Sequence, residues 1–169
     1  MIYTKAFDSK RFCFVPIHQE HASELFEAVS HPLFPKSLLL AQIRTLEQAH
    51  HWCKERVSDW QSGEAFVWTC VDKANQLIIG QVTIQKRVNC LALSYWINPE
   101  FWGRGYATEM CRDVLVYLSE SGYQGIVWAG VHHWNTGSCR VLAKLGFETI
   151  NSGEEFIEYK ISISNTKIA

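Results

Sequence analysis

One segment restricts the fold of this chain more than any other: a glycine-rich turn between a predicted strand and a predicted helix. Residues 98–109 read NPEFWGRGYATE, with Gly103, Gly105 and Ala107 at alternate positions. Small residues let a ligand approach the backbone closely, and free N–H groups at a helix N-terminus favour an anion. Arg104 adds a positive charge. The pattern predicts a phosphate-binding turn, although a turn that needs glycine only for backbone reasons would look the same.

The apolar pattern around this turn predicts a mixed α/β domain. Short runs rich in β-branched and aromatic residues predict strands over 11–17, 66–71, 77–85, 90–97, 125–132, 147–150 and 156–163. Apolar residues at helical spacing predict helices over 19–30, 45–62, 104–121 and 136–145. No linker, repeat or low-complexity segment interrupts this order. We therefore expect residues 1–169 to form one domain, with its core at about residues 10–163.

Composition restricts the class of partner. A formal net charge of −1 disfavours a dedicated nucleic-acid binder, although it leaves room for a local basic patch. No apolar run is long enough to cross a bilayer, and the polar N-terminus does not resemble a secretory signal. The six cysteines include no CxxC pair, which is typical of a reducing compartment. We expect a cytoplasmic protein, monomer or homodimer, without a nucleic-acid or membrane partner.

A second polar segment, VHHWNTGS, follows the strand predicted at 125–132. The amide of Asn135 can both donate and accept hydrogen bonds toward an extended ligand that contains amides. Alternatively, Asn135 caps the next helix. Ser138 is a polar candidate in the first turn of that helix, or only an ordinary helix residue.

Together, the segments FWGRGYATE and NTGSCRVLAKLGF resemble the GNAT superfamily of N-acetyltransferases, and within it the RimJ/RimL type that acetylates ribosomal-protein N-termini. The resemblance covers roughly residues 10–163. It implies an α/β (α+β) fold with four helices. It also implies a mixed central sheet of about seven strands, splayed between the fourth and fifth.

The resemblance also implies acetyl-CoA as co-substrate and no metal. The diphosphate would bind main-chain amides of the glycine turn, while the pantetheine arm would pair with the edge of strand 90–97. The implied contacts are Trp96, Ile97, Trp102, Gly103, Arg104, Gly105, Tyr106, Ala107, Thr108 and Asn135.

The sequence indicates the catalytic residues less clearly than the cofactor contacts. Many relatives place a tyrosine at the position of Leu142, and the resemblance makes Ser138 the substitute general acid. His132 has a suitable ordinary pKa for a base, but a packed structural histidine is an equal alternative. Glu109 is a second base candidate with a structural alternative. We also expect a β-bulge near Ile97 whose N–H would hold the thioester carbonyl.

The implied reaction is direct attack of a primary amine on acetyl-CoA in a ternary complex. A protein α-amine is expected as acceptor, because its pKa of about 8 makes deprotonation easier than for lysine. A small-molecule amine and a catalytically silent CoA-binding module are the alternatives. An apolar acceptor pocket is expected from Trp68, Trp134 and the loop 31–40. Histidines near residues 18–21 and 50–53 lack the spacing of a metal site.

Overall fold

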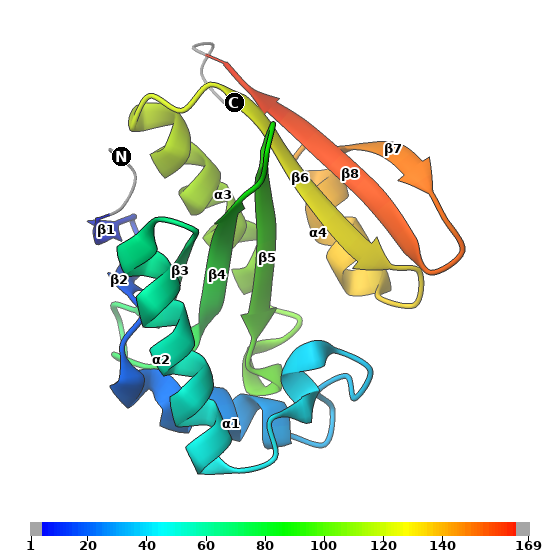
Figure 1. The fold of residues 1–169 in the computed structure, drawn as a ribbon. Coiled ribbons are helices and arrows are strands. Elements are labelled where there is room, and N and C mark those ends of the chain that lie inside the picture. The colour runs from blue at the N-terminus through cyan, green and yellow to red at the C-terminus, as the bar shows by residue number, and fades with distance from the viewer. Residues whose placement is uncertain (1–4, 165–169) are drawn as a thin grey trace.

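The computed structural model describes residues 5–164, in which the chain forms one eight-stranded sheet with helices on both faces (Figure 1). The domain predicted over 1–169 therefore extends beyond the described residues at both ends. The strands are β1 (Phe7–Asp8), β2 (Phe12–Pro16), β3 (Ala65–Asp72), β4 (Ile78–Lys86), β5 (Leu91–Ile97), β6 (Gly125–His132), β7 (Glu148–Ser152) and β8 (Phe156–Ile163). The α-helices are α1 (Ala22–Ser30), α2 (Leu46–Ser62), α3 (Tyr106–Glu120) and α4 (Thr136–Lys144), and short 3₁₀ turns lie at η1 (Gln19–His21), η2 (Leu39–Gln42) and η3 (Pro99–Phe101).

The strands follow the spatial order β1-β2-β3-β4-β5-β6-β8-β7. All neighbours are antiparallel except β5 and β6, which are parallel. The predicted mixed α/β fold with four helices is confirmed. The sheet has one strand more than expected, because β1 contributes only two residues, too few to show a period in the sequence.

The sheet is nearly divided where β5 meets β6. These strands pair only at Leu91 with Val127 and at Ala92 with Trp128. From Leu93 to Ile97, β5 has β4 beside it on one edge and no strand on the other. The predicted splay between the fourth and fifth expected strands is therefore confirmed.

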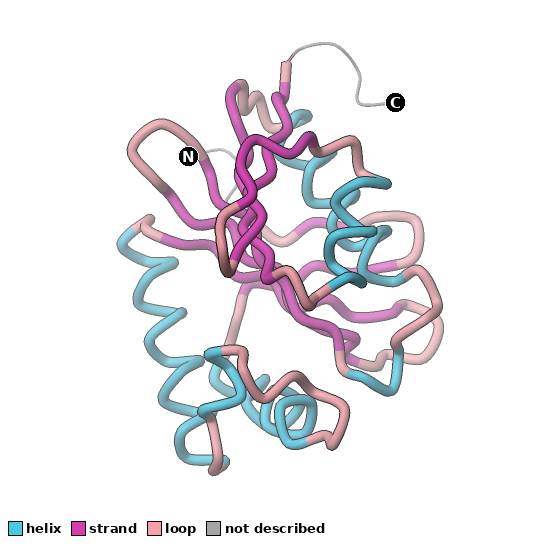
Figure 2. The backbone as a smooth tube through the Cα atoms, turned by 90° about the vertical axis from the view of Figure 1, so that its right-hand side faces the viewer, coloured by secondary structure: helices cyan, strands magenta, loops and turns pink. Residues whose placement is uncertain are grey.

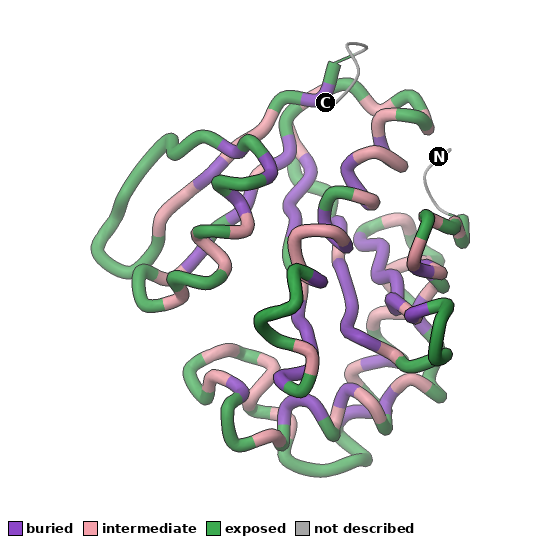
Figure 3. Tube along the Cα trace, turned by 180° about the vertical axis from the view of Figure 1, so that it is seen from behind, coloured by how far each residue is buried: buried purple, intermediate pink, exposed green. Residues whose placement is uncertain are grey.

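Two hydrophobic cores form, one on each face of the sheet. Figure 2 shows helices on both sides of the strands. Alternation along β3 shows the division: Val67 packs with α1 and α2, whereas Phe66 and Trp68 pack with α3. The expectation that Trp68 lines an acceptor pocket is wrong, because its ring is fully buried in the α3 core. Figure 3 shows the central strands as the most continuously buried part of the trace. Within residues 5–164, no helix is both long and apolar enough to cross a membrane.

Gly80 permits the close approach of β4 and β5 beside this splay. A Cβ at Gly80 would collide with the main-chain carbonyl of Trp96 and lie 3.1 Å from the Cα of Ile97. Gly80→Ala should therefore lower the free energy of unfolding by about 1–3 kcal/mol, the usual cost of overpacking. Urea denaturation measures the change. Gly153→Ala is the matched control, because the nearest atom to its Cβ would be 3.5 Å away, and equal midpoints for both variants would contradict the prediction.

Candidate active site

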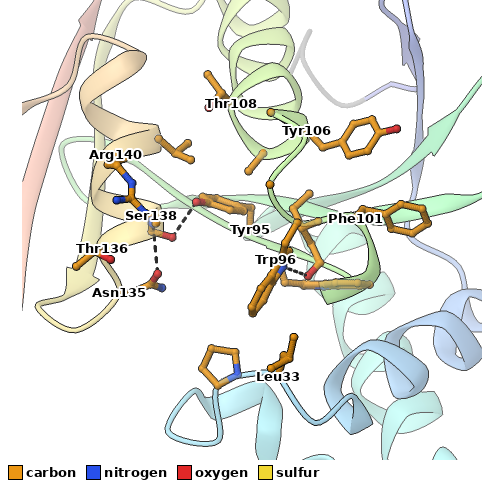
Figure 4. Close-up of a pocket in the computed structure, with 18 of the residues that line it drawn as sticks. Leu33, Tyr95, Trp96, Phe101, Tyr106, Thr108, Asn135, Thr136, Ser138 and Arg140 are labelled. Atoms are coloured by element: carbon orange, nitrogen blue, oxygen red, sulfur yellow. Dashed lines mark hydrogen bonds between the residues drawn. The ribbon is translucent and has the colours of Figure 1, made fainter.

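A cavity of about 610 Å³ opens where β5 and β6 part (Figure 4). It is enclosed by the end of β5, the glycine turn before α3, the start of α4 and the connection between α1 and α2. Its lining residues are Leu33, Phe34, Pro35, Leu38, Tyr95, Trp96, Ile97, Phe101, Trp102, Gly103, Gly105, Tyr106, Ala107, Thr108, Trp134, Asn135, Thr136, Gly137, Ser138, Arg140, Val141 and Lys144. Trp134 and four residues of the loop 31–40 are thus in the wall, as expected.

The glycine turn presents an open helix N-terminus to this cavity. Gly103 and Gly105 have φ values of 77° and 78°, in the left-handed region that favours glycine. A Cβ at either position would meet no protein atom within 4 Å, so the space in front of the turn is open to a ligand. Gly105 is the N-cap of α3, and no side chain caps this end. The N–H groups of the first helical turn are therefore available to an anion.

The side chains of Tyr106 and Glu109 pack on the side of this turn that faces Arg11 and β3, although the Tyr106 residue also lines the cavity. The Tyr106 ring is buried, and its hydroxyl lies 3.5 Å from Asp72. The guanidinium of Arg11 lies 4.2 Å from the centre of the Tyr106 ring and forms a 3.0 Å ion pair with Glu109. This ion pair offsets the one carboxylate in the first turn of α3. Glu109 thus has the structural role that was the alternative to a catalytic one.

Two cations that the sequence analysis missed line the cavity. Arg140 and Lys144 follow Thr136 at intervals of four residues, so all three lie on one face of α4. That spacing, directly after Asn135, was the available signal. Arg104 is not among the lining residues, and its guanidinium lies 5.9 Å from the centre of the Phe101 ring. Since the lining holds no Asp, Glu or His, the described wall is positively charged.

Ser138 and Tyr95 form a hydroxyl pair between α4 and β5. Their oxygens are 2.8 Å apart, and Figure 4 shows the two side chains pointing toward one another. Asn135 Oδ1 accepts a 3.3 Å hydrogen bond from the Ser138 N–H, so Asn135 is both the helix cap and a cavity residue. Burial raises the pKa of Tyr95 far above its ordinary value, which keeps the phenol protonated. Leu142 is buried in the core and offers no hydroxyl.

The open edge of β5 carries main-chain groups at alternate residues. The pairing of β4 with β5 is continuous from Gly80–Ile97 to Lys86–Leu91, so the bulge expected near Ile97 is absent and that expectation is wrong. Asn98 donates to the Ile79 carbonyl at 2.9 Å, and alternation then turns the Trp96 main chain toward β4 as well. The main chains of Tyr95 and Ile97 face the opening. There the Ile97 carbonyl accepts a 2.9 Å hydrogen bond from the Trp102 indole.

His132 lies apart from this group. Its ring stacks on Trp134 with centres 5.3 Å apart and lies 4.3 Å from the Phe156 ring, and it is not among the cavity residues. The structure therefore brings Ser138 and Asn135 together and leaves His132 in an aromatic stack. Among the described residues, no three His, Cys, Asp or Glu side chains gather in a way that could hold a metal ion.

A family model for the GNAT acetyltransferase domain matches residues 11–148. The chain belongs to the GNAT acetyltransferases. It is therefore an acyl-CoA-dependent N-acetyltransferase that uses acetyl-CoA to acetylate an amine. The cavity fits that co-substrate, because an uncapped helix N-terminus, two left-handed glycines and two cations suit a diphosphate.

Solved structures share the fold over nearly the whole chain. A RimL ribosomal-protein α-N-acetyltransferase in complex with coenzyme A has a TM-score of 0.84 and 13% identity, covering 95% of this chain and 99% of that one. The microcin self-immunity acetyltransferase MccE, in complex with acetyl-CoA and AMP, has a TM-score of 0.79 and 17% identity, covering 92% and 94%. A ribosomal-protein alanine acetyltransferase from Vibrio fischeri has a TM-score of 0.74 and 21% identity, covering 96% and 98%. RimL and RimJ structures are thus among the neighbours, in agreement with the resemblance of the motifs.

The two cations give a direct test of the anion site. Arg140→Gln and Lys144→Gln should each weaken coenzyme A binding by about tenfold, since each removes a charge-assisted contact to phosphate. Titration calorimetry at two salt concentrations measures this, and the loss should shrink as salt rises. Lys54→Gln, on the exposed side of α2, is the control with the same charge change. Equal affinities in all three variants would contradict a phosphate role for α4.

Proposed function

We propose that this acetyltransferase transfers the acetyl group to the α-amine of a protein N-terminus, by direct attack in a ternary complex. The observation that carries the proposal is the charge of the cavity, which has Arg140 and Lys144 but no carboxylate among its described lining residues. Such a wall favours an amine that arrives neutral. Deprotonating an α-amine of pKa about 8 costs about 1 kcal/mol at pH 7, whereas a lysine of pKa about 10.4 costs about 4–5 kcal/mol.

The wall opposite the cations supports an acceptor with an uncharged end. Leu33, Phe34, Pro35 and Leu38 come from the connection between α1 and α2, and Trp134 faces the same cavity from the end of β6. Apolar walls with few polar groups are typical of pockets that enclose the end of a ligand. The fold likeness to ribosomal-protein N-terminal acetyltransferases is compatible with a peptide acceptor.

The glycine turn and the open edge of β5 would position the co-substrate, whose thioester supplies the activated acetyl group. Main-chain amides between Gly103 and Thr108 would hold the diphosphate, with Arg140 and Lys144 beside it. The main chains of Tyr95 and Ile97 would pair with the pantetheine arm as an added strand would. Asn135 uses Oδ1 for the helix cap, so its NH₂ group would donate to the ligand.

Ser138, with Tyr95 as its hydrogen-bond partner, would supply the proton that the departing sulfur needs. As the amine nitrogen bonds to the carbonyl carbon, the C–S bond breaks and the sulfur leaves with the electron pair. Ser138 then donates its hydroxyl proton to the sulfur, while the Tyr95 hydroxyl stays protonated and donates a hydrogen bond to the Ser138 oxygen across the 2.8 Å contact. The extra proton of the amine passes to water, and water returns a proton to the Ser138 oxygen. We assign no base role to His132, because it does not line the cavity.

Ser138→Ala should lower kcat by about a hundredfold, the lower range for loss of a general acid, while the Kd for coenzyme A stays nearly unchanged. Tyr95→Phe should lower kcat less, because Ser138 then keeps its own proton and loses only the hydrogen bond from Tyr95. Thiol-release assays measure kcat. Ser152→Ala, on the exposed strand β7, is the control. If Ser138→Ala retains full turnover, the acid role is wrong.

The acceptor is tested with matched peptides and acetyl-CoA. A peptide with a free N-terminus should be acetylated far faster than the same peptide with a blocked N-terminus and a free lysine. The kcat/KM for the free N-terminus should rise with pH up to about 8, where the α-amine is neutral. Preference for the lysine peptide would overturn the proposal, and preference for small amines would favour the alternative acceptor class.

We also propose a cytoplasmic location, on the basis of the cysteines. All six are free thiols, and Cys53, Cys70 and Cys111 are buried. Burial raises the pKa of Cys53 to about 11, which makes this thiol inert at neutral pH. Buried unreactive thiols are typical of proteins in a reducing compartment.

A further inference from the structure

A chain of hydrogen bonds runs along one face of the sheet, from Trp96 in the cavity wall to His21 at η1. The Trp96 indole N–H donates to Gln81 Oε1 at 3.0 Å. Gln81 Nε2 donates to Thr69 Oγ1 at 3.0 Å. Thr69 Oγ1 lies 2.8 Å from His21 Nδ1. The chain crosses from β5 through β4 and β3 to η1, and it touches the cavity only at Trp96.

The direction of every bond in this chain is fixed by chemistry. An indole N–H can only donate, so Gln81 must present its oxygen to Trp96 and its NH₂ group to Thr69. The His18 N–H donates to His21 Nδ1 at 3.1 Å, so this nitrogen carries no proton. The Thr69 hydroxyl therefore donates to His21 Nδ1, while the Thr69 oxygen accepts from Gln81. His21 completes the chain only as the neutral ring with its proton on Nε2.

Most of this path is buried too deeply for water to replace a lost partner. Thr69 is 0% exposed, Gln81 is 1% exposed and Trp96 is 6% exposed. A buried donor without an acceptor costs about 1–3 kcal/mol, so the arrangement is held more tightly than exposed hydrogen bonds would be. The Trp96 ring also packs among apolar residues of α1 and α2. The polar chain and this packing together define where the indole lies.

We propose that Gln81, Thr69 and His21 are positioning residues that hold the Trp96 indole in the wall of the acceptor cavity, and that a proton on His21 releases this hold. With Nδ1 protonated, Thr69 loses its acceptor. The His18 N–H then faces a second donor, and the buried Thr69 hydroxyl proton needs another acceptor. If the Gln81 amide turns to accept that proton, its NH₂ group faces the indole N–H. The effect on acetylation rests on the proposed function, whereas the hydrogen-bond chain does not.

The surroundings of His21 set the pH range of this effect. Burial and the neighbouring His18 lower the pKa of His21, while Glu24 on α1 and Glu20 on η1 act in the opposite direction. No charged group of α2 or β3 is among the causes of the shift. His21 is therefore neutral at pH 7 and takes its proton only below the ordinary histidine value of about 6.5. The hydrogen-bond chain that holds Trp96 in the cavity wall should therefore be complete at neutral pH and interrupted in acid.

The indole N–H resonance of Trp96 in a ¹H–¹⁵N spectrum tests the chain without any substrate. The resonance is assigned by its loss in Trp96→Phe. In the wild type it should shift as pH falls below about 6.5. In His21→Asn, where an amide oxygen replaces Nδ1 as a permanent acceptor, it should be independent of pH. His50→Asn, an exposed histidine on α2, should behave as the wild type. A Trp96 resonance that ignores pH, or that titrates equally in His21→Asn, would overturn the proposal.

Kinetics then test the consequence for the acceptor. Gln81→Leu should raise the acceptor KM by about tenfold, equivalent to about 1.4 kcal/mol, with a much smaller change in the KM for acetyl-CoA. If the acceptor KM is unchanged while the resonance behaves as expected, the indole position does not matter to the acceptor. Failure of every amine in the assay would instead count against the proposed function alone.

If Gln81→Leu does not fold, the pH dependence of the free energy of unfolding provides a second test. Because the folded-state pKa of His21 is lowered, the unfolded chain binds more protons as pH falls through 6.5. The free energy of unfolding should therefore decrease in that window. His21→Asn should remove this part of the pH dependence and His50→Asn should not. Identical pH profiles for the two variants would contradict the proposal.

Discussion

The separation of β5 from β6 is the constraint on which the rest of the structure depends. After two paired residues the strands diverge, and every main-chain group beyond that point needs another partner. The structure meets this need in two ways. The Ile97 carbonyl accepts a hydrogen bond from the Trp102 indole, and the remaining edge faces the cavity. An open sheet of this kind is a natural site for an extended ligand, because the edge already has the geometry of half a ladder.

The separation also explains why two adjacent residues of β5 have different roles. Side chains alternate along a strand, so Tyr95 faces α4 while Trp96 faces α1. In a closed sheet, side chains on opposite faces would not line the same cavity. Here both side chains reach the same cavity, since no strand stands between them. Each is held by hydrogen bonds from its own side, Tyr95 to Ser138 and Trp96 to Gln81.

The sequence predicted features that depend on local patterns. Periodicity located the helices and all strands except the two-residue β1, and the glycines marked the open end of α3. The resemblance supplied the splay, which no local pattern contains. Local patterns could not predict contacts between positions far apart in the sequence. Tyr95 and Ser138 are 43 residues apart, and His21 and Thr69 are 48 apart. The sequence did allow the position of Arg140 and Lys144 on one helix face to be predicted, since their spacing follows from helix geometry. The bulge near Ile97 was wrongly expected because it came from the resemblance and not from these residues.

The bare end of α3 has a thermodynamic consequence. Most helices satisfy their first N–H groups with a side chain, as α2 does with Thr45, and losing such a cap typically costs about 1 kcal/mol. Gly105 has no side chain that could form such a cap, so α3 lacks this stabilisation when no anion is bound. A phosphate at this point would act as the missing cap, and occupancy of the site would then add to the free energy of unfolding through mass action. The resistance of this enzyme to heat and proteolysis would thus follow the supply of its own co-substrate.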